Sequence, residues 1–244
     1  MSVVLPYKES DLNKKKQVEQ MFDNIAHRYD FLNRILSFGI DKGWRKKVVK
    51  LLSVSNPKLV LDMATGTADL ALELSKIKGV TIKGVDLSEG MLEIGKKKVI
   101  NKGLQGSIEL LQGDSERILF NDLTFDAATV AFGVRNFENL EQGLTELARV
   151  LKPGGKLFVL EFSKPSSFPY KQVYNFYFKN ILPTVGKFFS NDSSAYTYLP
   201  DSVNAFPDGE NFAAIMEKCG FTSIERYPLT FGIATIYVGL KPLG

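Results

Sequence analysis

The chain has 244 residues, of which 44% are hydrophobic and 24% charged, an ordinary balance for a folded globular protein. This composition excludes a collagen-like, coiled-coil or disordered chain. The 31 lysines and arginines exceed the 27 aspartates and glutamates by only four. So small an excess is far from the concentrated charge of a dedicated nucleic-acid binder, and no nucleic-acid partner is expected.

The rare residue types and the hydropathy pattern restrict the chemistry and the compartment. A single cysteine, Cys219, excludes an internal disulfide and a cysteine-based cluster, and the single histidine argues against zinc, so no metal is expected. The sequence has no apolar run of about 18 residues and no signal-peptide core. These features predict a cytoplasmic protein that spans no membrane.

The length predicts one α/β domain with an elaboration, because a typical domain has roughly 150 residues. Four segments differ in character. Residues 1–55 are helical, basic and aromatic, and residues 56–163 alternate strand and helix signals as a cofactor-binding core does. Residues 164–206 form an aromatic-rich insertion, and residues 207–244 add a helix and two strands that complete the sheet.

Two helices are predicted in the N-terminal segment. The first carries apolar residues at helical spacing, namely Val18, Met21, Phe22 and Ile25. The second begins at Asp41, whose carboxylate is expected to cap it. Its predicted apolar face consists of Trp44, Val48, Leu51 and Leu52. Its predicted solvated face consists of Lys42, Arg45, Lys46, Lys47 and Lys50.

The central segment has the rhythm of a parallel sheet. Strands are predicted at residues 59–63, 81–86, 108–111, 125–131 and 156–161. Helices are predicted at residues 68–76, 91–101 and 140–151, the last stopped by the turn Pro153-Gly154-Gly155. This alternation indicates a doubly wound, Rossmann-like sheet with right-handed crossovers. Such a sheet binds its ligand beyond the carboxyl ends of its strands.

The first predicted strand ends in a loop suited to a nucleotide-type ligand. Gly66 permits a tight turn and a close approach of the ligand, and the Thr67 hydroxyl can donate a hydrogen bond. Asp62, just before the turn, suits an ammonium group. The loop lacks the Gly-x-Gly-x-x-Gly pattern, which argues against a pyrophosphate on it and therefore against NAD.

Carboxylates end the next two strands. Asp86, 20 residues after Gly66, can accept both hydroxyls of a ribose, and Asp114 can accept from the exocyclic amine of adenine. A helix cap and a plain turn are the alternative explanations of these two residues. An amino acid, a ribose and an adenine in series describe S-adenosylmethionine (SAM), whose demethylated product is S-adenosylhomocysteine. The activated methyl would then face the end of the fourth strand, at residues 132–136.

Segments along most of the chain resemble the C-methyltransferases of menaquinone and ubiquinone biosynthesis, the UbiE/MenG type. They are residues 21–33, Trp44-Arg45, Phe132-Gly-Val-Arg-Asn136, residues 149–155 and Leu160-Glu-Phe-Ser-Lys-Pro165, with further matches at 196–202, 206–207 and 229–233. Asp41 departs from the family, which usually has histidine there. The sequence Gly66-Thr-Ala-Asp69 favours the menaquinone branch.

The resemblance implies an activity and its residues. The family's cofactor-binding residues fall on Thr67, Asp86, Asp114 and Ser115. The implied reaction methylates a ring carbon of a polyprenylated demethylmenaquinol, the last step of menaquinone synthesis. The implied catalytic or substrate-orienting residues are Arg135 and Asn136, with Tyr29 and Asp30 over the site. A salt bridge is the alternative role of Arg135. The candidates for a base are Tyr29, Asp30, His27 and Tyr196, or a water held by Arg135 and Asn136.

The aromatic-rich insertion is consistent with a flat ring and an isoprenoid tail, because it holds 11 aromatic residues in its 43 positions. They are Phe168, Tyr170, Tyr174, Phe176, Tyr177, Phe178, Phe188, Phe189, Tyr196, Tyr198 and Phe206. Packing within the insertion is the alternative explanation for most of them. Exposed members could form a homodimer or a peripheral membrane contact at the inner face of the membrane.

Three other functions remain open at this point. A methyltransferase acting on the ubiquinone precursor or another aromatic acceptor would share the cofactor half. An RNA methyltransferase would need a larger basic patch. A protein that binds the cofactor only to assemble a quinone-synthesis complex would be expected to lose Asp86 or the loop at Gly66, and both are present.

Overall fold

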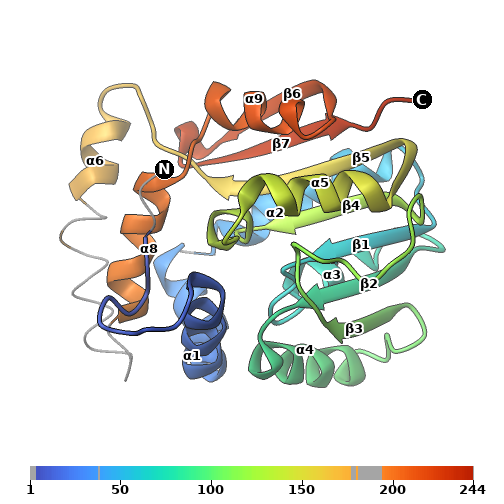
Figure 1. The fold of residues 1–244 in the computed structure, drawn as a ribbon, viewed down its shortest axis with the longest axis horizontal. Coiled ribbons are helices and arrows are strands. Elements are labelled where there is room, and N and C mark those ends of the chain that lie inside the picture. Colours follow the sequence, from blue (N-terminus) through green and yellow to red (C-terminus); the bar gives the residue numbers. More distant parts are fainter. Residues whose placement is uncertain (1–3, 38, 177–179, 181–193, 244) are drawn as a thin grey trace.

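The computed structural model describes residues 4–37, 39–176, 180 and 194–243 (Figure 1). Its elements in chain order are α1 (Lys14–Leu36), α2 (Asp41–Ser53), β1 (Leu59–Met63), α3 (Asp69–Leu74), β2 (Thr81–Asp86), α4 (Glu89–Asn101), β3 (Ile108–Gln112), β4 (Phe125–Ala131), η1 (Val134–Asn136), α5 (Leu140–Val150), β5 (Leu151–Phe162), α6 (Tyr170–Phe176), α8 (Ser194–Ala205), α9 (Glu210–Lys218), β6 (Thr222–Leu229), η3 (Thr230–Gly232) and β7 (Ala234–Leu240).

The described residues contain seven strands, which form one sheet in the order β3-β2-β1-β4-β5-β7-β6. Strands β1 to β5 are parallel, and β7 runs antiparallel between β5 and β6. The predicted doubly wound α/β sheet is therefore confirmed, including its two C-terminal strands. The strand order reverses between β1 and β4, which is the switch point where such sheets bind ligands.

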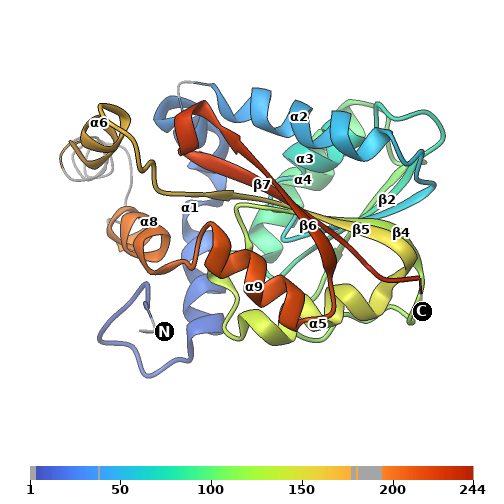
Figure 2. The ribbon, with the colours of Figure 1, turned by 90° about the horizontal axis from the view of Figure 1, so that it is seen from above.

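Helices cover both faces of the sheet, with α2, α3 and α4 on one face and α5 and α9 on the other (Figure 2). Each face has its own apolar core. Val48 and Leu52 of α2 belong to the first, and Leu144 and Leu147 of α5 to the second, all four without exposed surface. Each helix buries one apolar stripe against the sheet, and the central strands are buried on both of their faces. The result is three layers, with the sheet between two layers of helices.

Two expectations about the second helix are wrong. Asp41 does not cap α2, because its carboxylate accepts hydrogen bonds from Ser37 Oγ (2.7 Å) and from the Arg45 guanidinium instead. Arg45 is buried rather than solvated, and it also pairs with Asp69 at 3.0 Å. The predicted apolar face is correct in that Trp44, Val48 and Leu52 are buried.

The strand β5 is longer than the sequence predicts. It begins at Leu151, before the Pro153-Gly154-Gly155 turn, because Leu151 pairs with Phe125 of β4 and the register then shifts. The main chain of Gly154 adopts a φ of +77°, so the turn lies within the strand as a bulge.

Among the described residues, the helices α1, α6 and α8 lie beyond the end of the sheet toward which β4 points (Figure 1). Helices α1 and α8 contact each other there, and Tyr198 packs with Val18 and Met21. In the described part of the chain, no helix has both the length and the apolar character needed to cross a bilayer.

Candidate active site

A pocket that is partly open to solvent lies at the carboxyl ends of β1, β2, β3 and β4, with α1 along one side. Six of the ten predicted site residues line it: Tyr29, Gly66, Asp86, Asp114, Ser115 and Asn136. The other four, Asp30, Asp62, Thr67 and Arg135, are not among the lining residues. The switch-point location predicted from the strand order is therefore where the structure has its pocket.

Asp86 is tied to the loop after β1. The Gly66 N–H donates to Asp86 Oδ2 at 2.7 Å, and the Ser88 N–H donates to Oδ1 at 2.9 Å. Burial raises the pKa of the Asp86 carboxyl to about 6, although these main-chain donors oppose the rise. Because the carboxylate also lines the pocket, it is positioned to accept hydrogen bonds from a ligand's hydroxyls.

The main chain is tightly folded where the loops after β1 and β4 meet. Ala64 and Phe132 both line the pocket with left-handed φ angles, +54° and +57°. A Cβ on Gly133 would lie 2.5 Å from the Cβ of Ala64, so only glycine fits there. Left-handed non-glycine residues cost about 1–3 kcal/mol each and concentrate at functional sites, which favours this end of the sheet as the site.

Asp62 lies beneath the loop rather than at the pocket surface. Its two carboxylate oxygens accept hydrogen bonds from the hydroxyls of Thr65 and Thr129, both at 2.6 Å, and the residue is almost fully buried. Burial raises the pKa of this carboxyl to about 6, against the effect of the two hydroxyl donors. Asp62 thus fixes the conformation of the loop between β1 and α3.

Thr67 and Asp30 belong to one polar network on the far side of that loop. The Thr67 hydroxyl donates to Asp30 at 2.5 Å and accepts from Lys98 Nζ at 2.9 Å. Lys98 also pairs with Asp30 (2.5 Å) and with Asp69 (2.7 Å), and Asp69 pairs with the buried Arg45. The network joins α1, α2, α3 and α4 around the loop.

Little in the sequence predicts this polar network. Only the pair Asp41 and Arg45, four residues apart on one helix, has a spacing that predicts contact. Lys98 looks like one lysine in a run of three solvated ones, yet it is the member of the run that reaches Asp30 and Asp69. Long-range pairs of this kind depend on the packing of α1 against α4, which no local pattern indicates.

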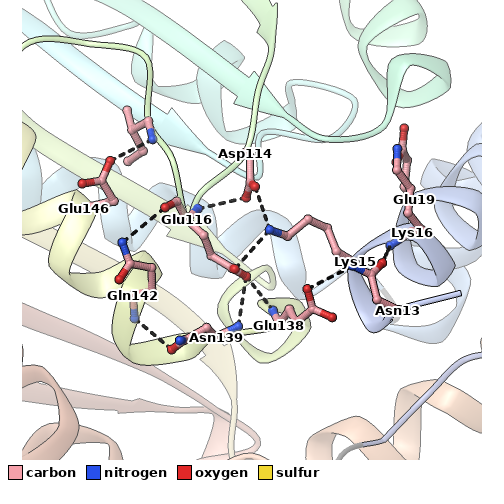
Figure 3. A network of polar contacts seen from close by, with 11 residues as sticks. Asn13, Lys15, Lys16, Glu19, Asp114, Glu116, Glu138, Asn139, Gln142 and Glu146 are labelled. Atoms are coloured by element: carbon pink, nitrogen blue, oxygen red, sulfur yellow. Dashed lines mark hydrogen bonds and ion pairs between the residues drawn. The ribbon is translucent and has the colours of Figure 1, made fainter.

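Lys15 of α1 lines the pocket and contacts Asp114, the residue expected to accept from adenine (Figure 3). Its ammonium donates to Asp114 Oδ2 at 2.7 Å and to Glu116 Oε2 at 3.1 Å. Glu116 Oε1 in turn accepts from the N–H groups of Glu138 and Asn139, at 2.9 and 3.0 Å. The loops after β3 and β4 are thereby joined to α1 at the residue expected to contact adenine.

Asn136 connects the pocket to the C-terminal helices. It lines the pocket, and its Oδ1 accepts a hydrogen bond from the Tyr198 hydroxyl at 3.1 Å. Tyr29 lines the same pocket from α1, and its ring meets that of Phe22 edge to face. Burial raises the pKa of Tyr29, so this phenol is neutral at ordinary pH.

Arg135, the neighbour of Asn136, forms a buried ion pair. Its Nη1 donates to Glu161 Oε1 at 2.8 Å and to the Phe132 carbonyl at 2.6 Å. The alternative considered for Arg135, a salt bridge to a carboxylate, is therefore present. Glu161 was not predicted as a site residue, although it stands in the Leu160-Glu-Phe-Ser-Lys-Pro165 motif.

Of the remaining candidates for a base, His27 is not in the pocket wall. His27 is exposed on α1, and the Tyr196 side chain lies outside the described residues. Of the predicted aromatic set, Tyr174, Tyr198 and Phe206 are buried, whereas Phe168 and Phe176 are exposed. Four more members of the set lie outside the described residues, namely Tyr177, Phe178, Phe188 and Phe189. The last member, Tyr170, is the first residue of α6.

Comparison with known sequences assigns the chain to a family. The ubiE/COQ5 methyltransferase family matches residues 10–241. The chain belongs to this family. It is 46% identical to a demethylmenaquinone methyltransferase of Bacteroides fragilis over 98% of this chain and 97% of that one. It is 49% identical to a ubiquinone/menaquinone biosynthesis C-methyltransferase of Geobacter sulfurreducens, over 94% and 90%.

Solved structures agree on the fold of this family member. A SAM-dependent methyltransferase from Thermotoga maritima superposes with a TM-score of 0.64 at 20% identity, covering 91% of this chain and 99% of that one. A methyltransferase from Methanococcus maripaludis gives 0.62 at 20% identity, covering 97% of each chain. The predicted family, the Rossmann-like fold and the SAM-dependent methyltransferase activity are confirmed.

Proposed function

We propose that this ubiE/COQ5 family member transfers the methyl group of SAM to a ring carbon of a polyprenylated demethylmenaquinol and forms the menaquinol. The observation that carries the proposal is the 46% identity, over 98% of the chain, to a relative named demethylmenaquinone methyltransferase. The pocket at the switch point supplies the site, because its lining includes two carboxylates at neighbouring strand ends, Asp86 and Asp114.

The acceptor is the reduced quinol. An oxidised quinone is electron-poor and a weak nucleophile, whereas a quinol that loses a hydroxyl proton gains electron density at the adjacent carbon. SAM supplies the electrophilic methyl when bound. The protein's contribution is to hold the ring carbon in line with the methyl–sulfur bond, and such positioning can supply several kcal/mol of the acceleration.

The pocket residues are placed to contact successive parts of SAM. Asp86 accepts hydrogen bonds from the ribose hydroxyls. Asp114 accepts one from the adenine amine after the Lys15 ammonium has moved away from it. Ser115 contacts the adenosine beside Asp114, and the main chain at Gly66 allows close approach. Asp62 and Thr67 act indirectly by fixing that loop, since neither lines the pocket.

SAM affinity is expected to fall in acid because the ribose contact needs the Asp86 carboxylate. With a pKa of about 6 in the free protein, binding at pH 5 should be about tenfold weaker than at pH 7. Titration calorimetry at both pH values measures this. The Asp86→Asn variant, which cannot ionise there, should lose most of the difference, and a wild-type affinity that stays constant to pH 5 would contradict the ribose contact.

Acid unfolding through these carboxyl groups would not explain weaker SAM binding at pH 5. Asp62 and Asp86 both have pKa values raised to about 6, above that of an unfolded aspartate. The folded state therefore binds more protons than the unfolded state between about pH 4 and 6. These two groups make the fold more stable as the pH falls through that window, so weaker binding at pH 5 reports the ligand contact.

A ubiquinone precursor is the second candidate acceptor, because the Geobacter sulfurreducens relative is named for both quinone types. Expression in bacteria that lack their own enzyme of this family, followed by quinone extraction and mass spectrometry, separates the two. Restored menaquinone alone supports the proposal. Restored ubiquinone alone would assign the chain to the other branch.

The polyprenyl tail of the acceptor makes a membrane contact part of the proposal. Four large apolar side chains at one end of the molecule are between 61% and 79% exposed, namely Phe168, Val173, Phe176 and Phe231. Phe231 stacks on Tyr170 of α6 at 3.9 Å between ring centroids, so it lies against the helix that carries Val173 and Phe176, and we treat the four side chains as one patch. Exposed Lys171 of α6 adds a positive charge suited to anionic lipid.

Replacing two members of that patch should release the protein from lipid. Phe168→Ser with Phe176→Ser removes apolar area that is already exposed, so the melting temperature should stay within about 2 °C. Sedimentation with vesicles containing phosphatidylglycerol should show a several-fold loss of bound protein. Unchanged binding, or a change in oligomeric mass instead, would assign the patch to another contact such as a homodimer.

A further inference from the structure

A buried ion pair lies beside the pocket, where β5 meets η1. Glu161 of β5 has no exposed surface, and its Oε1 accepts from Arg135 Nη1 and from the Phe162 N–H, both at 2.8 Å. Arg135 follows the pocket-lining residues Phe132 and Gly133 and precedes Asn136, which also lines the pocket. The pair is therefore held directly behind the wall that faces the activated methyl.

Two polar atoms of this pair have no hydrogen-bond partner among the described residues: Oε2 of Glu161 and Nε of Arg135. Buried polar atoms in native proteins are nearly always paired, because an unpaired one costs about 1–3 kcal/mol. The first atom accepts a hydrogen bond and the second donates one. A hydroxyl, which both donates and accepts, complements the two.

The surroundings of the pair suit an aromatic hydroxyl. The Arg135 guanidinium carbon lies 5.5 Å from the centre of the Phe162 ring, and that ring packs on Phe132 with 4.6 Å between centroids. Phe132 lines the pocket. A flat ring that enters beside Phe132 would therefore bring its polar edge toward the ion pair.

We propose that Glu161 accepts the proton of the acceptor's ring hydroxyl through Oε2, while Arg135 Nε donates to the hydroxyl oxygen. This rests on the proposed function, since it needs an aromatic acceptor that carries a hydroxyl. Glu161 is then a catalytic residue, and Arg135 holds both the carboxylate and the developing phenolate.

The step balances in atoms and charge. Glu161 takes the hydroxyl proton, and the electron-rich ring carbon forms a bond to the methyl group. The methyl–sulfur bond breaks and leaves its electron pair on sulfur. Tautomerisation then moves the proton of the methylated ring carbon to the ring oxygen, and the quinol reforms. The proton held by the Glu161 carboxyl is the one proton released, and its loss to solvent restores the carboxylate for the next turnover.

The groups around Glu161 favour it over the neighbouring phenols as the base. Burial raises the pKa of the Glu161 carboxyl, and Arg135 opposes the rise, so the carboxylate is a stronger base than an exposed one. Tyr174 of α6, Tyr198 of α8 and Tyr237 of β7 also face it, and burial raises the pKa of each, that of Tyr198 to about 12.

Glu161→Gln tests the proposal because it keeps the shape of the side chain and removes its basicity. At saturating SAM and demethylmenaquinol, kcat should fall by about 10²–10⁴-fold, the usual contribution of a general base. The wild-type kcat should rise with pH through the Glu161 pKa, and this acid limb should vanish in the variant. SAM affinity by calorimetry should stay within twofold, because the proposed SAM contacts at Asp86, Asp114 and Ser115 do not involve Glu161.

The matched control is Glu146→Gln. Glu146 also pairs with an arginine, Arg149 at 2.7 Å, but on α5 and outside the pocket lining. Its kcat and pH profile should equal those of the wild type. If Glu161→Gln does not fold, Glu161→Asp decides the matter, because it keeps the charge and shortens the reach of the carboxylate.

In Glu161→Asp the acid limb of the pH profile should persist with a displaced midpoint, and kcat should fall at least tenfold below that of the wild type. A Glu161→Gln enzyme within fivefold of wild-type kcat, or an unmoved limb in either variant, would overturn the proposal. Wild-type enzyme that methylates no quinol would instead overturn the proposed function. The two failures are thus distinguishable.

Discussion

Asp86→Ala should weaken SAM binding by about 10²–10⁴-fold. The carboxylate is proposed to accept both ribose hydroxyls, and hydrogen bonds to a charged group contribute roughly 1.5–3 kcal/mol each. Asp86 also accepts from the N–H groups of Gly66 and Ser88, so the loop loses an anchor as well. Titration calorimetry at pH 7.5 measures the dissociation constant directly.

Asp126→Ala is the matched control for that experiment. Asp126 likewise accepts from two main-chain N–H groups, those of Lys58 and Leu59, both at 2.8 Å, but it lies at the opposite end of the strands from the pocket. Its substitution should leave SAM affinity within twofold of wild type. Equal affinity of Asp86→Ala and wild type would remove the ribose assignment.

Arg135→Ala should cut turnover at least 100-fold while SAM affinity stays within twofold. Arg135 does not line the pocket, so no direct cofactor contact is lost. Its removal leaves Glu161 charged, buried and unpaired, and breaking a buried pair in this way costs about 3–5 kcal/mol. The melting temperature should therefore fall by roughly 10 °C for a chain of this size. Steady-state kinetics and calorimetric melting measure the two effects.

A double substitution separates stability from catalysis at this pair. Arg135→Met with Glu161→Gln removes both charges, so most of the lost melting temperature should return, because a buried pair is replaceable by uncharged groups. Turnover should stay low, since neither the proton acceptor nor its partner remains. Wild-type turnover in Arg135→Ala, or its full return in the double variant, would exclude Arg135 from the reaction.

The fold is predictable from the sequence because its signals are local. Short apolar strands, amphipathic helices and the residues at strand ends place the sheet, its switch point and Asp86 without reference to distant contacts. The same reasoning places Gly66 and Asn136 near the ligand, because each follows a predicted strand. Five of the six predicted site residues that line the pocket end or follow a predicted strand, and the sixth, Tyr29 on α1, comes from the family resemblance.

The failures concern pairings between distant segments. Arg45 pairs with Asp69 as well as with Asp41. Lys98 pairs with Asp30, which precedes it by more than 60 residues in the chain. Glu161 and Arg135 pair because β5 and the turn after β4 are neighbours in the sheet. Charge alone predicts solvent exposure for such residues, and only the packing of α1 and the strand order indicate which of them are buried.

Methyl transfer from labelled SAM to short-tailed demethylmenaquinol, under reducing conditions, tests the central claim most directly. The oxidised quinone and the ubiquinone precursor run in parallel with the same enzyme. Label should enter the menaquinol product, and the oxidised quinone should stay unlabelled because its ring carbon is a poor nucleophile. Label in none of the acceptors, despite tight SAM binding, would contradict a quinol acceptor. SAM binding at the pocket would then stand without an assigned acceptor.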